Sequence, residues 1–243
     1  MFSTNYVRRK DYGTASPQDE FIVSLLRHHI EEILPTYAKS SSLNPRALDV
    51  GCGSQPFRKN LEILGYTYTS IDAEQNPENS VDVVCRIDQP LPSEAIANGT
   101  FDFILCTEVM EHVVDWNMAF SNFSQLLTPE GRLFITCPYF YPLHEEPYDF
   151  WRATPYTLQH FGNKFGLKIL YQVNAGDGWD VLGTLLGSIY SEPKSHSLGD
   201  RILSKVISLC QKVVLKLLLA RFLQRFAHLK GKLYLANIVV FEK

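Results

Sequence analysis

The sequence contains no closely spaced cysteine pair and no apolar leader. Its five cysteines are odd in number and lie far apart, so no Cys-x-x-Cys pair marks a zinc site or a redox motif. This usage is typical of reduced thiols packed inside an intracellular protein. The N-terminal stretch MFSTNYVRRKDYG is polar and basic and lacks the apolar run of a secretory signal. The sequence therefore predicts a cytoplasmic protein.

Acidic residues are absent from 201–241, although the whole chain carries a net charge of −3. Residues 201–243 hold 9 of the 23 Lys and Arg but only 1 of the 26 Asp and Glu, which leaves residues 1–200 with a balance of −11. Nucleic-acid binding normally needs a basic footprint. The acidic main part of the chain therefore argues against a nucleic-acid partner.

A long helix is predicted over 201–229, with apolar residues around a basic face of Arg201, Lys205, Lys212 and Lys216. Its charges recur too often for a membrane span, which needs about 20 apolar residues. Two interpretations stay open. The helix either caps the sheet or forms a homodimer interface, or it makes a peripheral contact with an anionic membrane, so that the protein is membrane-associated.

Strand-like and helix-like segments alternate along the chain without an internal repeat. The first is a helix predicted to begin at a cap on Ser16 and to end at Pro35. Such alternation favours βαβ units and a mostly parallel sheet covered on both faces, so we predict a doubly wound α/β fold in a single domain, 1–243. Its core comprises 16–173 and 233–243, and a helical insertion that begins with a glycine-rich loop occupies 174–232. Seven strands are expected, at 46–50, 66–71, 81–85, 101–106, 133–137, 167–173 and 233–241.

The turn after the first predicted strand lacks the third glycine of a dinucleotide-binding motif. Gly51 and Gly53 are present, but Pro56 stands at the third position, which disfavours NAD and FAD. The two glycines still let the backbone approach a ligand closely. Asp49 can meet the cationic amino group of an amino-acid-bearing cofactor, and Asp72, at the end of the next strand, can accept both ribose hydroxyls.

Four motifs, ALDVGCGS, SIDAE, FDFILCTEVMEHV and LTPEGRLFITCP, follow one another within residues 46–138. In this order and spacing the chain resembles the class I S-adenosylmethionine-dependent methyltransferases. The resemblance implies S-adenosyl-L-methionine as cofactor and a Rossmann-like sheet that ends in an antiparallel strand. It places Asp88 at the adenine amino group. The residues it implies for cofactor binding are Asp49, Gly51, Cys52, Gly53, Asp72, Ala73, Asp88, Cys106 and Thr107.

The motif EVMEHV spaces Glu108, Glu111 and His112 at i, i+3 and i+4, which on a helix places them on one face. Such a set can hold a hard divalent cation, which would lower the pKa of a substrate hydroxyl. The pattern resembles the magnesium-binding motif of ubiquinone-pathway O-methyltransferases and of small-RNA 2′-O-methyltransferases, and the latter resemblance adds His144 as a ligand. Alternatively, these groups cap the helix, or a histidine acts as a general base. The catalytic candidates are His112, His144 and Glu111.

The segment HEEPYDFWRATP, after the fifth predicted strand, supplies the substrate-facing candidates Tyr148, Asp149 and Arg152. The alternative is a lid in which Asp149 and Arg152 form a local ion pair. The segment resembles methyltransferases of bacterial polysaccharide and glycolipid biosynthesis, which implies O-methylation of a small molecule, sugar or glycan intermediate. The alternative functions are an RNA 2′-O-methyltransferase and a non-catalytic scaffold protein.

Overall fold

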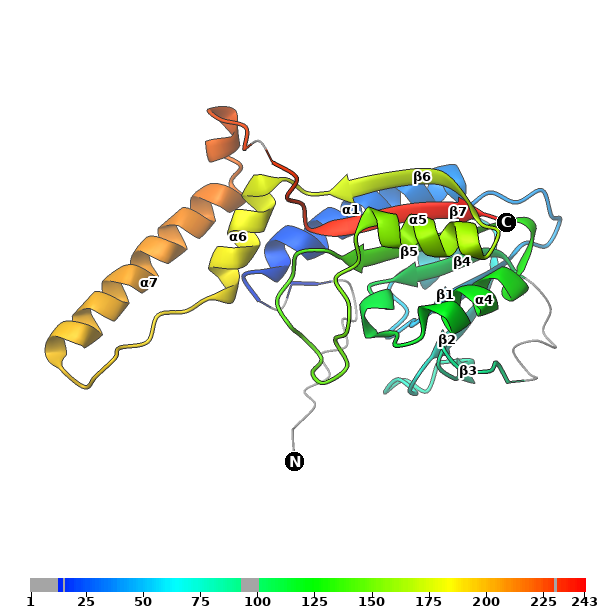
Figure 1. The fold of residues 1–243 in the computed structure, drawn as a ribbon, viewed down its shortest axis with the longest axis horizontal. Helices are drawn as coiled ribbons and strands as arrows, with labels where there is room; N and C mark the ends of the chain where they lie inside the picture. Colours follow the sequence, from blue (N-terminus) through cyan, green and yellow to red (C-terminus); the bar gives the residue numbers. More distant parts are fainter. Residues whose placement is uncertain (1–12, 15, 93–100, 230) are drawn as a thin grey trace.

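A computed structural model describes residues 13–14, 16–92, 101–229 and 231–243. The first 12 residues, on which the prediction about a secretory signal depends, lie outside these ranges. Seven strands form one sheet in the order β3-β2-β1-β4-β5-β7-β6, and β7 runs antiparallel to both of its neighbours (Figure 1). This confirms the predicted doubly wound α/β fold. The strands are β1 (Arg46–Val50), β2 (Thr67–Asp72), β3 (Val83–Val84), β4 (Phe101–Thr107), β5 (Leu127–Pro138), β6 (Lys168–Ala175) and β7 (Ala236–Glu242).

Helices cover both faces of the sheet, because successive side chains of each central strand point to opposite sides. Phe103 and Leu105 of β4 pack with the helix α1 (Asp19–Tyr37), while Ile104 and Cys106 pack on the other face. Two apolar clusters result, and the strands that separate them are almost fully buried. The helices near the second face are α4 (Trp116–Leu126) and α5 (Pro155–Lys164), and α2 (Arg58–Ile63) follows β1.

The start of α1 differs from the prediction of a Ser16 cap. The helix begins at Asp19, and the Asp19 carboxylate accepts a hydrogen bond from the backbone N–H of Ser16 at 3.0 Å. Pro35 does not end the helix either. It lies inside the last turn and α1 continues to Tyr37.

The glycine-rich stretch after β6 is a helix and not the predicted loop. Helix α6 (Gly178–Ser188) begins with a capping box, in which Asp177 and Asp180 each accept from the backbone of the other. The helix packs against α1 so closely that a Cβ on Gly183 would stand 2.3 Å from the ring of Phe21. The glycines therefore serve helix packing here.

The predicted helix 201–229 is shorter and begins earlier, as α7 (Leu198–Leu219). Arg221 adopts a left-handed φ of 54°, and the N–H groups of Arg221 and Phe222 return to the carbonyls of Leu218 and Leu217. This is a Schellman end, and a 3-10 turn, η2 (Leu223–Arg225), follows it. Of the helices within the described residues, none is both long and apolar enough to cross a lipid bilayer.

Candidate functional site

The glycine turn after β1 is tight and lies against the segment that follows β4. Gly51 and Gly53 have φ values of 66° and 51°, and the N–H groups of Gly51 and Cys52 both donate to the carbonyl of Ile71. A Cβ on Gly51 would stand 2.3 Å from a methyl of Val109. Only glycine therefore fits at position 51, both for its backbone and for its neighbour.

Two acids flank this turn in different environments. Asp49 is buried, its Oδ2 accepts from the Tyr68 hydroxyl at 2.7 Å, and burial raises its pKa to about 7. Asp72 accepts from the N–H of Gly53 at 2.8 Å and from the N–H of Glu74 at 3.2 Å. Each oxygen of Asp72 thus keeps a lone pair for a further donor. The predicted cofactor residues of β1 and β2 lie together at one edge of the sheet.

The remaining predicted cofactor residues have distinct surroundings. Both oxygens of Asp88 pair with Arg86 at 2.9 Å, and Oδ2 also accepts from the N–H of Val114 at 3.2 Å. Cys106 is fully buried in the core, Thr107 is half-buried at the end of β4, and Ala73 is exposed just after β2. The contacts of Asp88 join the segment after β3 to the segment after β4, and its role at the adenine group stays a prediction.

The prediction that Glu108, Glu111 and His112 share a helix face is wrong. Only a single 3-10 turn, η1 (Met110–His112), forms there, and Glu108 precedes it with a left-handed φ of 54°. The Glu108 carboxylate instead accepts from the Thr136 hydroxyl at 2.9 Å. A 3-10 turn has three residues per turn, so the i, i+3, i+4 spacing no longer defines one face.

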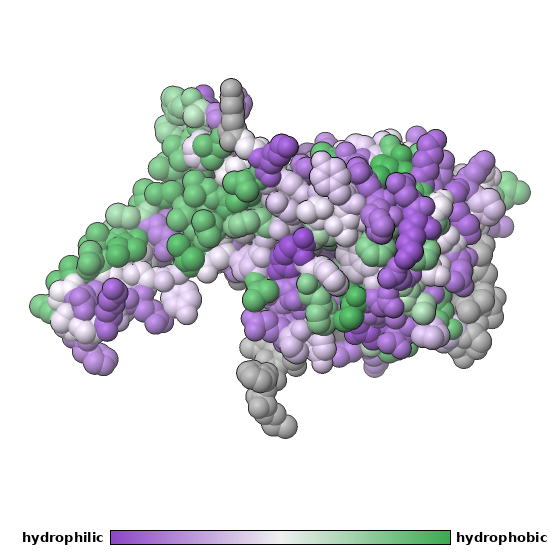
Figure 2. All heavy atoms as spheres, viewed as in Figure 1, coloured by the Kyte–Doolittle hydropathy of each residue, from purple (hydrophilic) through white to green (hydrophobic). Residues whose placement is uncertain are grey.

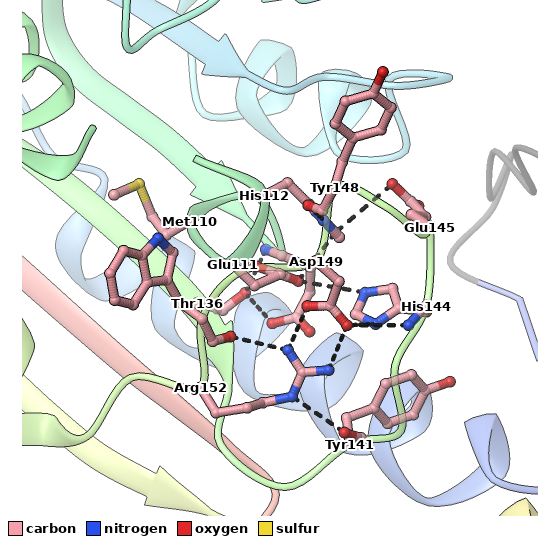
Figure 3. A network of polar contacts seen from close by, with 12 residues as sticks. Met110, Glu111, His112, Thr136, Tyr141, His144, Glu145, Tyr148, Asp149 and Arg152 are labelled. Carbon is pink, nitrogen blue, oxygen red and sulfur yellow. Dashed lines mark hydrogen bonds and ion pairs between the residues drawn. The ribbon is translucent and has the colours of Figure 1, made fainter. Parts of the chain in front are cut away.

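Glu111, His112 and His144 nevertheless come together (Figure 3). One ligand atom from each of the three lies within 4.8 Å of the others. Nε2 of His112 is 3.7 Å and Nε2 of His144 is 3.8 Å from Oε1 of Glu111. Glu111 is 1% exposed, and neither of its oxygens has a hydrogen-bond partner among the described residues. Burial raises the pKa of this carboxyl above its usual value, against the charge of His112.

Hydrogen bonds set the tautomer of both imidazoles. Nδ1 of His112 lies 2.8 Å from the carbonyl of Tyr148, and Nδ1 of His144 lies 3.2 Å from both the carbonyl of Pro142 and the Asp149 carboxylate. These partners only accept, so in the neutral rings Nδ1 carries the proton and Nε2 keeps its lone pair. In the neutral rings, two Nε2 lone pairs therefore face the carboxyl group of Glu111. This arrangement fits a metal ion whose histidine ligands are oriented by outer partners.

The segment that carries His144 is held by Arg152. Its guanidinium donates to both oxygens of Asp149, at 2.5 and 2.7 Å, and to the carbonyls of Tyr141 and Pro142. Burial disfavours an ionised Asp149, but the bonds from Arg152 and from the N–H of His144 outweigh it and lower the pKa of Asp149. Asp149 and Arg152 thus form the local ion pair of the alternative interpretation. Tyr148 is 53% exposed, and the substrate-facing roles of all three stay predictions.

The sequence did not reveal several residues of this site. The sequence indicates Tyr68 only as part of a strand. Its position on β2, diagonal to Asp49 of the paired strand β1, is the signal that points to the contact. Glu145, with Oε2 3.7 Å from Nε2 of His112, was seen only within the segment after β5. Val109 carries no sequence signal, because its contact with Gly51 depends on the fold.

Comparisons with known proteins agree with this architecture. The family model described as a methyltransferase domain matches residues 20–183. A curated relative, the ubiquinone biosynthesis O-methyltransferase of Xanthomonas oryzae pv. oryzae (strain PXO99A), is 33% identical over 100 residues, which cover 37% of this chain and 42% of the relative. The matched part is thus less than half the length of the curated relatives.

Two solved structures share the fold. A SAM-dependent methyltransferase from Archaeoglobus fulgidus has a TM-score of 0.52 at 15% identity and covers 89% of this chain and 94% of its own. A structure described as a putative sarcosine dimethylglycine methyltransferase from Galdieria sulphuraria has a TM-score of 0.54 at 14% identity, with coverages of 97% and 94%. With the family model spanning most of the sheet and both acids of the glycine turn, the chain belongs to the methyltransferase-domain family.

Proposed function

We propose that the chain transfers a methyl group from S-adenosyl-L-methionine to a hydroxyl of a small molecule or sugar. The observation that carries the proposal is the buried carboxylate of Glu111, without a hydrogen-bond partner among the described residues and faced by Nε2 of His112 and of His144. Such a set beside a cofactor turn suits removal of a proton from an acceptor. The fold alone does not carry the proposal, since one similar solved structure is a cyclase.

The cofactor half uses groups at the ends of β1 and β2. An ionised Asp49 attracts the ammonium of the methionine moiety, and the free lone pairs of Asp72 accept the ribose hydroxyls. The glycine turn lets the backbone lie against the cofactor. Methyl transfer then needs an acceptor oxygen held in line with the sulfonium, and such positioning accounts for much of the rate.

Glu111, His112 and His144 are the residues that would hold a divalent cation. Bound there, a cation would lower the pKa of an acceptor hydroxyl. Two imidazoles and one carboxylate suit first-row transition ions better than Mg²⁺, which prefers oxygen ligands. Without a cation, Nε2 of either histidine is the lone pair that takes the hydroxyl proton.

The small-molecule or sugar acceptor is favoured over RNA. Residues 1–200 carry the −11 balance, and repulsion by phosphates would oppose docking of a polynucleotide there. The relatives named ubiquinone biosynthesis O-methyltransferase methylate an oxygen atom, as their name states. This supports a hydroxyl over an amine as the acceptor.

Calorimetric titration with S-adenosylhomocysteine tests the cofactor half. We expect binding by the wild type and its loss in Asp72→Asn. Absence of binding by the wild type would overturn the methyltransferase proposal and favour a scaffold. Transfer of a labelled methyl group to a panel of sugars and phenols then tests the acceptor class.

Titration with Mn²⁺, Zn²⁺ and Mg²⁺ tests the metal half separately. We expect Mn²⁺ or Zn²⁺ to bind the wild type and to bind Glu111→Gln and His144→Ala at least tenfold more weakly, because each variant removes one ligand. His160→Ala is the matched control, since that histidine is exposed on α5. Equal affinity of Glu111→Gln and wild type would exclude this cation site and leave the histidines as bases.

A further inference from the structure

Helix α7 turns its apolar side away from the body of the protein. Ser204 and Gln211 face inward, where their side chains donate to the carbonyls of Ser191 and Ile189 at 3.0 and 2.6 Å. The opposite face carries an apolar stripe at four- and three-residue spacing, and every member is exposed. We define the stripe by its residues: Ile202, Val206, Leu209, Val213 and Leu217.

The stripe is long, and exposed apolar residues also follow the helix. Its members are 37–63% exposed, and the exposed rings of Phe222 and Phe226 pack edge to face with their centroids 5.1 Å apart. Figure 2 shows hydrophobic side chains gathered along the arm of the molecule that α7 forms. An apolar surface of this extent is unusual for a free surface and marks a docking face.

A basic row runs along one edge of the stripe. Arg201, Lys205, Lys212 and Lys216 fall within about a fifth of the helix circumference, and all are exposed. No acid lies between 201 and 219. The family model ends at residue 183, so α7 lies outside the matched residues.

We propose that α7 binds an anionic membrane surface, with the stripe in the acyl boundary and the basic row at the headgroups. Charge decides between this occupant and a second copy of the chain. The acid of α7, Asp200, lies in its first turn. Two stripes packed on each other therefore bring further lysines to the contact and no acid from residues 201–219 to neutralise them, whereas anionic lipids supply that charge. In this arrangement α7 lies along the surface, as a basic amphipathic helix does.

The position of α7 in the fold gives this docking a consequence. The parallel strands β4 and β5 point toward the side of the molecule on which α6 and α7 lie (Figure 1). The arm is anchored there by the ion pair of Arg221 with Asp180, at 2.9 Å, and by the bond of the Trp179 indole to the carbonyl of Ala227, at 3.0 Å. In the docked protein, the carboxyl edge of the sheet would therefore lie at the end of the molecule that the arm attaches to the membrane.

Flotation of the full chain with phosphatidylcholine vesicles, with and without phosphatidylserine, tests the proposal. We expect flotation with the anionic vesicles only, and loss of flotation at high salt. Lys205→Gln with Lys212→Gln and Lys216→Gln should lower the partition coefficient about a hundredfold, since each basic residue near the surface contributes about fivefold.

Leu209→Asp with Val213→Asp should abolish flotation. The matched control places the same charges on exposed apolar residues of the body, as Leu43→Asp with Ile63→Asp, and should still float. Thermal unfolding and S-adenosylhomocysteine binding, measured on every variant, separate misfolding and failure of the proposed function from loss of docking. The proposal would be overturned in favour of self-association by a wild type that does not bind vesicles and sediments as a dimer. In that case the Leu209→Asp, Val213→Asp variant should sediment as a monomer.

Discussion

Lowering the pH from 8 to 6 should weaken cofactor binding by protonating Asp49. Burial raises the pKa of this carboxyl to about 7, although the hydrogen bond from Tyr68 opposes the shift. With that pKa the ionised fraction falls from about nine tenths at pH 8 to about one tenth at pH 6. If only the carboxylate holds the ammonium of the cofactor, the Kd rises about tenfold, which corresponds to about 1.4 kcal/mol.

Calorimetry with S-adenosylhomocysteine measures this dependence. At pH 6 binding should release close to one proton per site, which titrations in two buffers of different ionisation enthalpy reveal. Asp49→Asn should bind S-adenosylhomocysteine weakly at every pH. The pH dependence of its Kd corrects the wild-type values for titration of the amino group of the ligand. A wild-type Kd that is constant from pH 6 to 8, with no proton released, would refute the role assigned to Asp49.

The same pKa predicts how Asp49 affects stability. The unfolded chain loses this proton near pH 4 and the folded chain near pH 7, so the contribution of Asp49 to stability falls as pH rises through this window. Above pH 7 the full cost, about 4 kcal/mol for a shift of about three units, is present. Asp49→Asn keeps an acceptor for Tyr68, and without ligand it should unfold at a higher temperature than wild type at pH 8 but not at pH 4.

Two glycines give further predictions. Gly51→Ala should destabilise the protein by about 2 kcal/mol or more in urea unfolding, because residue 51 has a φ of 66° and the new Cβ would clash with Val109. Adding Val109→Ala should restore only the part of the stability that the clash removes. Gly183→Ala should cost about 1–3 kcal/mol, because the ring of Phe21 occupies the space of its Cβ, whereas Gly199→Ala, with nothing within 4 Å, should be neutral or stabilising. Equal unfolding midpoints of Gly183→Ala and Gly199→Ala would contradict the close packing of α6 on α1.

The sequence predicts the sheet and the meeting of Asp49 with Asp72 well, because both depend on short-range patterns. Each strand is an apolar run beside a turn, and Asp49 and Asp72 end neighbouring parallel strands, so their meeting follows from the strand order. The bond from Gly53 to Asp72 then joins groups that the motif already singles out. The resemblance to the methyltransferases rests on motifs that include these residues.

The sequence predicts the arrangement of Glu108, Glu111 and His112 and the shape of the insertion less well, because long-range contacts set their geometry. The spacing of EVMEHV suggests a helix, but the bond of Glu108 to Thr136 on β5 and the packing of Val109 on Gly51 leave only a 3-10 turn. Similarly, α7 ends at a Schellman turn whose left-handed residue is Arg221 instead of the usual glycine. Its pairing with Asp180 is visible only in the fold.

The buried acids show where the fold carries uncompensated charge. Burial raises the pKa of Asp180, but Arg221 pairs with that carboxylate at 2.9 Å, so its place in the structure is explained. Among the described residues, the side chain of Asp49 accepts a hydrogen bond from a neutral hydroxyl and Glu111 has no hydrogen-bond partner. A buried carboxylate without a cation costs stability, so both positions are explained best by what binds there. The ammonium of the cofactor and a metal ion are both cations. Each would offset the cost of one of these buried carboxylates, and both carboxylates lie at the same edge of the sheet.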